Sequence, residues 1–241
     1  FKFRLKGINT FLIISGGNAV KRTLVPILTV FIILLFGNVI FAYSEELDMN
    51  IEKPVVFTST GESAVGYAVH ALLQMADVPY DLCLNVDESI LQMGSGFPVR
   101  ERDKYWQQFE SSYNFPEGTP FKTVVFMMGA LEESGTDYMP VFFLKPQITA
   151  NLEWAKNNEL TIIGMHITGQ KDRGTSPQSE NEEVIDLVTP YCDMLIVTNS
   201  SNYDGRFTDI GEELNIPVLT VEKITDLVPI FRELFGLEMA E

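Results

Sequence analysis

The chain has 241 residues, with 33 acidic against 17 basic side chains and a formal net charge of −16. An acidic surface repels nucleic acid and anionic lipid, so both are excluded as main partners. With two cysteines and no Cys-x-x-Cys spacing, the sequence also argues against a thioredoxin-like site and a structural zinc site.

Residues 20–42 are typical of a secretory signal peptide. Lys21 and Arg22 precede an apolar run at 24–36, and Ala42 is a small residue suited to the cleavage position. Cleavage there would leave Tyr43 at the mature N-terminus. We therefore expect an exported protein, periplasmic or extracellular.

Two further expectations concern the N-terminal region. Residues 24–42 are just long enough to span a bilayer, so an uncleaved membrane anchor is the alternative to cleavage. Removal of residues 1–42 takes away five of the 17 basic residues and none of the 33 acidic ones. The remaining 199 residues then carry 12 basic residues and a net charge near −21.

Residues 1–19 are expected to be an upstream segment translated in error. Gly16 and Gly17 can be encoded as a ribosome-binding sequence a few nucleotides before Val20, and GTG is both a valine codon and a bacterial start codon. The hypothesis is that translation begins at Val20. Other codons at these positions in the gene would contradict it.

After a linker at 43–52, residues 53–237 alternate strand-like apolar runs with amphipathic helical segments. The expected strands are Pro54–Ser59, Tyr80–Leu84, Thr123–Met128, Leu160–Ile167, Asp193–Thr198 and Pro217–Val221. The expected helices are Ala64–Ala76, Gln147–Asn158, Glu180–Tyr191, Phe207–Leu214 and Asp226–Leu237. Continuous apolar strands are typical of a parallel sheet buried on both faces. The sequence therefore predicts one α/β domain with a doubly wound, Rossmann-like, mainly parallel sheet of five to six strands.

Two connections in this domain are long enough to be functional. Residues 85–121 combine glycine, proline and aromatic residues, and a helix is expected inside them at Val99–Glu110. Residues 129–146 leave the third strand at its carboxyl end, which makes them the better candidate for a lid. An ordinary insertion is the alternative for both.

Cys83 and Cys192 each lie in or beside an apolar stretch. We expect both to be buried thiols, because free cysteine is among the most buried residue types. A Cys83–Cys192 disulfide is the alternative and would need the two segments to lie close together.

Polar loops follow several of the predicted strands, and parallel strands place their carboxyl ends at one edge of the sheet, where ligands bind. The candidate ligand-binding residues are Ser59, Thr60, Gly61, Glu62 and Ser63 after the first strand, Gly129 after the third, His166, Gly169, Lys171, Asp172 and Arg173 after the fourth, and Asn199, Asn202 and Asp204 after the fifth. Each loop also has a simpler interpretation, as a helix cap or a turn. The turn Thr60–Ser63 is neither a Walker loop nor a Gly-x-Gly-x-x-Gly motif, so nucleotide binding does not follow and the cofactor is left unknown.

The loop after the fourth strand is the most informative of these. His166 can hold a proton near neutral pH, bind a metal or donate to a ligand carboxylate, or it can be satisfied by a loop carbonyl. Lys171 and Arg173 add positive charge that is scarce on this chain, which favours an acidic group on the ligand.

Two function classes remain open. The first is a binding module for a small polar, possibly acidic, metabolite at the strand ends. The second is an extracytoplasmic hydrolase or isomerase with His166 as general acid or base, oriented by Asp172 or Glu62. In that reading a nucleophilic Ser59 would need His166 within hydrogen-bond reach. A metal site made of His166, Asp172 and Asp204 is a weaker option. The oligomeric state is not predicted.

Three segments resemble an exported bacterial α/β family of unknown function: Thr58–Ser63, Ile163–Gly174 and Asn202–Gly205. The resemblance covers most of 53–237. It implies a fold and a site at the strand ends, but no reaction. The chain departs from the family pattern in two places. An acidic segment starts at Gly129 where the family has a lysine- and glycine-rich loop, and Thr168-Gly169 stands where two glycines are usual.

Overall fold

The computed structural model describes residues 51–61, 63–83, 88–96, 101–102, 107–111, 115–129, 141–173 and 179–237. They belong to one compact unit, Met49–Glu241. The predicted upstream segment and signal peptide lie outside the described residues, as does nearly all of the linker. Within the described ranges, no helix combines the length and the apolar character needed to cross a membrane.

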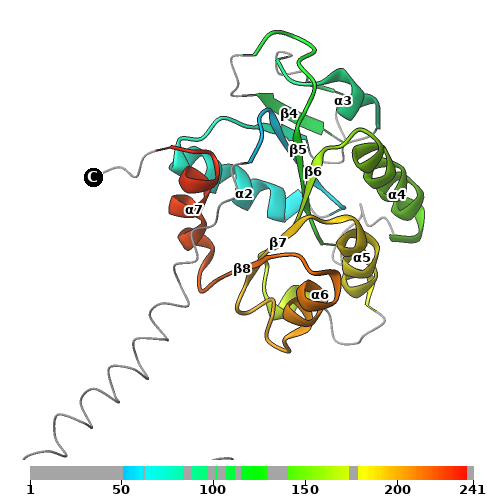
Figure 1. Ribbon diagram of the computed structural model, residues 1–241, viewed down its shortest axis with the longest axis vertical. Helices are drawn as coiled ribbons and strands as arrows, with labels where there is room; N and C mark the ends of the chain where they lie inside the picture. Colours follow the sequence, from blue (N-terminus) through cyan, green and yellow to red (C-terminus); the bar gives the residue numbers. More distant parts are fainter. Residues whose placement is uncertain are drawn as a thin grey trace, which may run out of the picture. The chain divides into compact units, whose positions relative to one another are not determined.

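Six parallel strands form the larger part of one eight-stranded sheet (Figure 1). In spatial order they are β2 (Asp81–Cys83), β1 (Val55–Ser59), β5 (Thr123–Met127), β6 (Thr161–His166), β7 (Met194–Thr198) and β8 (Val218–Val221). Every residue of β1, β5 and β7 is buried, as a sheet covered on both faces requires. The predicted α/β class with a mainly parallel, doubly wound sheet is confirmed.

Helices cover both faces of this sheet (Figure 1). On one face lie α2 (Ser63–Ala76) and α7 (Leu227–Leu234), where the rings of Phe57 and Phe231 meet edge to face at 6.0 Å. On the other lie α4 (Val141–Asn157), α5 (Glu180–Val188) and α6 (Arg206–Leu214). Their buried side chains share one core cluster with the strands, which includes Val124, Phe126, Leu152, Val184 and Phe207. The shorter helices are α3 (Glu88–Met93) and the 3-10 turns η1 (Gln170–Arg173), η2 (Thr189–Tyr191) and η3 (Ile224–Asp226).

The direction of winding reverses between β1 and β5. From β1 the chain passes to β2 on one side, whereas β5, β6, β7 and β8 follow one another on the other side. In open α/β sheets, ligands bind outside the carboxyl ends of the strands at such a switch point. The topology therefore singles out the ends of β1 and β5 as the first place to look for a site.

The helix predicted at Val99–Glu110 is wrong. The described residues of that segment are strand, in β3 (Glu101–Arg102) and β4 (Gln107–Ser111). These two strands pair antiparallel with each other, and β4 pairs antiparallel with β2. The pairing covers the outer edge of β2, which would otherwise present unpaired backbone groups. The sequence of β4 has no apolar run, so its strand conformation comes from this pairing.

The connection predicted at 129–146 is shorter than expected. Helix α4 begins at Val141 and contains Pro146, whereas the sequence placed its start at Gln147. Proline usually marks a helix start, but here it is the sixth residue of the helix. The rest of the lid candidate, residues 130–140, lies outside the described residues.

The two cysteines are free, buried thiols. Cys83 belongs to β2 and Cys192 lies two residues before the start of β7, four strand positions away in the sheet. At roughly 4.8 Å between neighbouring strands, the two are about 19 Å apart. The expectation of buried thiols is confirmed, and a Cys83–Cys192 disulfide is excluded by distance.

Candidate functional site

The predicted site residues gather in two groups at the carboxyl edge of the sheet. The residues after β1 and β5 meet each other, and the residues after β6 and β7 meet each other. We call the first group, together with the side chains of α4 beside it, the β1–β5 hollow. We call the second, which includes His166, Gly169, Arg173 and Asp204, the β6–β7 cluster.

Thr60 joins the ends of β1 and β5. Its backbone N–H donates to Met127 O (3.1 Å), and its hydroxyl donates to Gly129 O (2.9 Å) while accepting the Gly129 N–H (3.0 Å). The side chain is 2 % exposed. Thr60 therefore fixes the geometry of the switch point, and its hydroxyl is already engaged.

Gly61 lets this turn pass close beneath α4. Its φ is +141°, and a Cβ atom there would lie 2.9 Å from Leu144 Cδ1. A side chain at this position would therefore be both strained and crowded. Its backbone N–H donates to Ser59 Oγ (3.1 Å), so the sequence correctly identified a tight polar turn.

The β1–β5 hollow is small and partly open to solvent, with a cavity volume of about 20 Å³, room for about one water-sized group. It is lined by Ser59, Thr60, Phe126, Leu144, Gln147, Ile148 and Asn151. The four residues from α4 lie at positions i, i+3, i+4 and i+7, the spacing of a single helix face. The lining that the structure describes combines hydroxyls and side-chain amides with an apolar wall, and none of these seven residues is charged.

Not every predicted residue of this loop can be placed in the hollow. Glu62 lies outside the described residues. Ser63 is the first residue of α2, as a helix-start interpretation predicts, and nothing is described of its side chain. Gly129 is buried and bound to Thr60.

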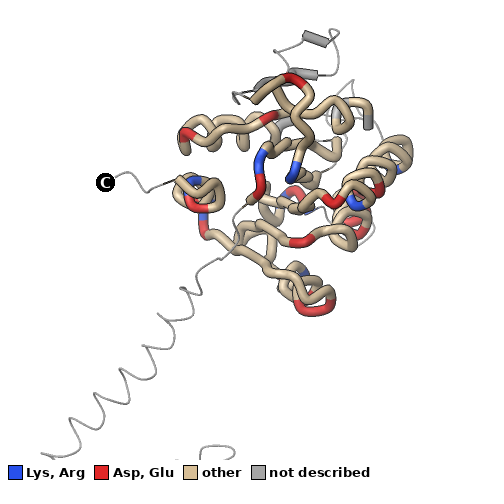
Figure 2. Tube along the Cα trace, turned by 45° about the horizontal axis from the view of Figure 1, so that its top comes forward, with Lys and Arg blue, Asp and Glu red and all other residues tan. Residues whose placement is uncertain are grey.

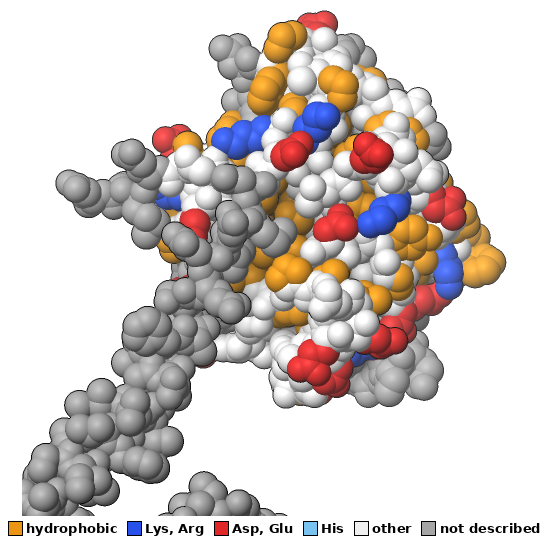
Figure 3. Space-filling model, in the orientation of Figure 1, with side chains coloured by type: hydrophobic (Ala, Val, Ile, Leu, Met, Phe, Trp, Pro, Cys, Tyr) orange, Lys and Arg blue, Asp and Glu red, His pale blue; other side chains and the backbone are white. Residues whose placement is uncertain are grey.

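His166 lies at the centre of the β6–β7 cluster and is fully buried. No histidine is visible among the described side chains on the face drawn in Figure 3. Its Nδ1 lies 2.9 Å from Ser201 Oγ, which also accepts the Gly169 N–H (3.0 Å) and contacts Thr198 Oγ1 (2.8 Å). Burial, followed by the positive charge of Arg173, lowers the pKa of His166 to about 4. The ring is therefore neutral at physiological pH.

Gly169 is required where β6 meets the turn after β7. Its φ is +91°, and a Cβ atom would lie 2.8 Å from Ser200 Oγ. The next residue, Gln170, donates its backbone N–H to the same hydroxyl (3.2 Å). This close approach explains a glycine here in structural terms.

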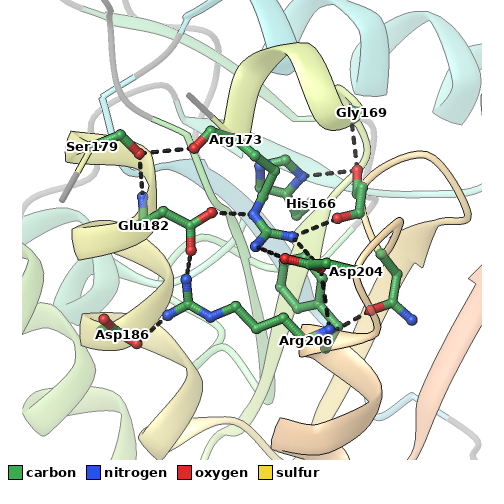
Figure 4. Close-up of polar contacts among 11 residues, drawn as sticks. His166, Gly169, Arg173, Ser179, Glu182, Asp186, Asp204 and Arg206 are labelled. Carbon is green, nitrogen blue, oxygen red and sulfur yellow. Dashed lines mark hydrogen bonds and ion pairs between the residues drawn. The ribbon is translucent and has the colours of Figure 1, made fainter. Parts of the chain in front are cut away.

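Arg173 is almost completely buried, with 2 % of its side chain exposed, and its donors are bound within the protein (Figure 4). Nε donates to Glu182, and Nη1 donates to Ser201 O (2.7 Å). Nη1 and Nη2 together hold the two oxygens of Asp204 at 3.2 and 3.0 Å. The guanidinium also lies over the rings of Tyr203 (5.4 Å) and Phe207 (5.3 Å).

The ion-pair network extends beyond Arg173. Glu182 also pairs with Arg206, which in turn pairs with Asp186 at the surface (Figure 4). Burial acts to raise the pKa of Asp204, but hydrogen bonds from Arg173 and from the Arg206 backbone, with the Arg173 charge, keep it below its usual value. The network ties α5 to the start of α6 and to the loop after β6.

The remaining residues predicted after β6 and β7 are less buried than His166 and Arg173, and two of them bond to nearby residues of the surface or of α6. Lys171 is exposed and Asp172 is half-buried. The Asn199 amide donates to Glu222, and Asn202 caps α6 by accepting the Phe207 N–H (2.9 Å). Asn202 therefore has the capping role that was the alternative to ligand binding.

The described residues contain no group of three or more His, Cys, Asp and Glu side chains able to hold a metal, so the hypothesis of a metal site made of His166, Asp172 and Asp204 has no support.

The pairing of Ser59 with His166 is excluded by the register of the sheet. Ser59 aligns with Met127 and Met127 with Met165, so these three side chains share one face. His166 follows Met165 and points to the opposite face. A hydrolase that uses Ser59 as nucleophile and His166 as base is therefore contradicted.

Several residues that shape these two groups were not predicted. In the cluster they are Ser201, Thr198, Glu182 and Arg206. In the hollow they are Gln147 and Asn151 of α4. Gln147 and Asn151 could have been predicted from the sequence, since two amides four residues apart interrupt an apolar helix face at Leu144 and Ile148. Nothing in the sequence pairs Glu182 or Arg206 with Arg173.

A protein-family model described as a domain of unknown function, DUF6305, matches residues 52–235. No curated protein and no solved structure matches the chain. The match agrees with the expectation of a family of unknown function, and its range includes both the hollow and the cluster.

Proposed function

The chain belongs to the DUF6305 family of domains of unknown function, and from the geometry of its sheet edge we propose that it binds a small polar metabolite, one polar group of which enters the β1–β5 hollow. One observation carries the proposal: a hollow lined by hydroxyl and amide groups lies where the winding of the sheet reverses. Ligand sites in α/β folds combine this position with a largely apolar wall and a few polar groups.

The lining favours a ligand that presents an uncharged polar group to it. An acidic ligand was expected because of the basic residues after β6, but Arg173 is engaged by Glu182 and Asp204. On α4, Lys145 is paired with Glu183 (2.9 Å). Acidic positions are spread over the helices and loops and outnumber the basic ones (Figure 2). Their field disfavours anions near the surface.

The alternative function, a hydrolase or isomerase that uses His166 as general acid or base, is less well supported. A general base must reach the proton it removes and titrate near the working pH. His166 is fully buried, and its pKa is lowered to about 4 by burial and by Arg173. No observation on the described residues favours catalysis over binding.

Gln147→Ala is the variant that tests binding in the hollow. We expect a polar metabolite found by a thermal-shift screen to bind about tenfold more weakly when this amide is removed, the effect of losing one hydrogen bond. Gln147 is exposed at its position on α4, so the fold should be retained. Titration calorimetry with the screened ligand measures the change.

Asn157→Ala removes an exposed amide near the end of the same helix and serves as the matched control. Its affinity for the ligand should equal that of the unmodified protein. A ligand that binds both variants with equal affinity would place its site elsewhere.

Export is part of this proposal, supported by the signal-like residues 20–42. When the full chain is produced in a bacterial host, we expect the mature protein to begin at Tyr43, after cleavage behind Ala42. Intact mass and N-terminal sequencing of the exported fraction measure this. Ala42→Leu should block the cut, because a large side chain does not suit the cleavage position. Recovery of the unmodified chain with residues 24–42 attached, in the membrane fraction, would support the anchor instead.

A further inference from the structure

Two phenylalanine rings are exposed at the start of α4. Phe142 is 74 % exposed and Phe143 is 66 % exposed, and the two rings meet edge to face with their centroids 5.4 Å apart. Single exposed apolar residues are common on protein surfaces, whereas adjacent large apolar side chains mark places where a ligand or partner binds. The pair is therefore a candidate recognition surface.

Helix geometry places Phe143 at the rim of the β1–β5 hollow. Phe143, Gln147 and Asn151 are spaced four residues apart, so they form one row along α4. Residues at this spacing have Cβ atoms about 5–6 Å apart, and a helical side chain leans toward the preceding turn. The Gln147 side chain, which lines the hollow, therefore leans toward Phe143. Asn151 also lines the hollow and is buried, so it lies at the inner end of the row.

The polar groups that line the hollow can both donate and accept hydrogen bonds. The carboxamides of Gln147 and Asn151 each have two N–H donors and an oxygen that accepts twice, and the Ser59 hydroxyl donates once and accepts twice. A carboxamide that already makes one bond within the protein keeps further positions for a ligand. A ligand hydroxyl also donates and accepts, and it is about the size of the one water-sized group that the hollow can hold. The lining is therefore complementary to a hydroxyl group.

We propose that the ligand is a neutral sugar, with one hydroxyl in the hollow and one face of its ring stacked on Phe143. The C–H groups on the face of a sugar ring are apolar and slightly positive, which matches the negative face of an aromatic ring. The hydroxyl groups project from the edge of the same ring, where the Gln147 carboxamide can donate to one and accept from its neighbour. A neutral sugar also has no charge for the acidic surface to repel. This inference rests on the proposed function, because it names the class of the metabolite bound there.

An amide ligand would use the same lining without the exposed ring. A carboxamide or peptide group can bond to Gln147 and Asn151 as a hydroxyl does, but its small planar group gains little from an aromatic platform beside the hollow. The position of Phe143, in one row with the two amides, therefore favours a sugar. Binding of glycosides and of N-methylacetamide, a minimal amide, separates the two classes.

Saturation-transfer nuclear magnetic resonance on protein produced from the full chain, with the methyl glycosides of glucose, galactose and mannose as probes, tests this assignment. We expect at least one glycoside to bind saturably, and the C–H protons on one face of its ring to receive the strongest transfer. Gln147→Ala should weaken its affinity about tenfold, the effect of losing one hydrogen bond. Phe143→Leu should weaken it about fivefold, because an apolar side chain remains and only the aromatic contribution is lost.

Two control variants separate stacking from a general loss of structure. Phe143→Tyr keeps an aromatic ring at the rim and should bind the glycoside as the unmodified protein does. Tyr67→Leu removes a ring that is 54 % exposed on α2, a helix on the opposite face of the sheet, and should also leave the affinity unchanged. Phe143 and Tyr67 are both exposed, so all of these variants should keep the melting temperature of the unmodified protein.

Two results would overturn the sugar assignment. One is a glycoside that binds Phe143→Leu as tightly as it binds the unmodified protein. The other is the absence of glycoside binding when N-methylacetamide, or a metabolite from the thermal-shift screen, binds in a way that depends on Gln147. The proposed function would then stand without the sugar. If no ligand of any kind depends on Gln147, the sugar assignment and the hollow as a binding site are both wrong.

Discussion

Arg173→Ala is expected to lower the free energy of unfolding by about 3 kcal/mol, the lower end of the range for breaking a buried ion pair. The guanidinium is 2 % exposed and binds Glu182, Asp204 and the carbonyl of Ser201. The loss stays near the lower end because Arg206 still pairs with Glu182. Urea denaturation monitored by circular dichroism measures the change.

A matched control is available on the surface of α4. Lys145→Ala removes an ion pair with Glu183 whose two side chains are 48 % and 44 % exposed. Such pairs contribute roughly 0–1 kcal/mol, so the two variants should differ by several-fold. Equal losses would mean that the buried network contributes no more than a surface pair, and the role assigned to Arg173 would be wrong.

His166 is expected to make the protein less stable as the pH falls from about 6.5 to about 4. In the folded state its pKa is about 4, so the ring stays neutral, whereas the unfolded chain binds a proton near the ordinary value of 6.5. The unfolded state therefore takes up more protons in this window, and stability present above pH 6.5 is lost on acidification. A shift of this size corresponds to about 3 kcal/mol.

The measurement is the difference in unfolding free energy between pH 7 and pH 4, compared among variants. His166→Asn should show a difference smaller by about 3 kcal/mol, whatever its absolute stability. His70→Gln, at the other histidine of the chain, is the matched control against which the change in His166→Asn is compared. An unchanged difference in His166→Asn would show that the ring is not held neutral by burial.

The parallel core of the sheet was predictable because its strands are buried on both faces. Runs such as Thr123–Met127 and Met194–Thr198 each contain four apolar side chains out of five, and burial of this kind is visible in composition alone. Strand β4 was not predictable, since Gln107–Ser111 is mostly polar and takes its conformation from pairing with β2. The start of α4 was obscured by Pro146, whose usual place is a helix terminus.

The candidate site was predictable in position but not in detail. Polar residues after parallel strands converge on one edge by topology, which correctly brought Thr60 to Gly129 and Arg173 to Asp204. The same reasoning could not show that Arg173 is neutralised within the protein. Its partner Glu182 lies nine residues away on α5, and only the folded chain brings them together. Charge counted along a sequence overstates the charge available to a ligand.

The bonds made by Thr60 have a mechanical consequence. One threonine side chain holds both the N–H and the carbonyl of Gly129, so the chain leaving β5 starts from a fixed pivot. A displacement of Gly129 must either break both bonds or carry the turn that precedes α2 with it. That turn also passes close to α4, because a Cβ atom at Gly61 would lie 2.9 Å from Leu144 Cδ1. The position of Gly129 at the end of β5 is thus coupled to the turn before α2 through a single hydroxyl group.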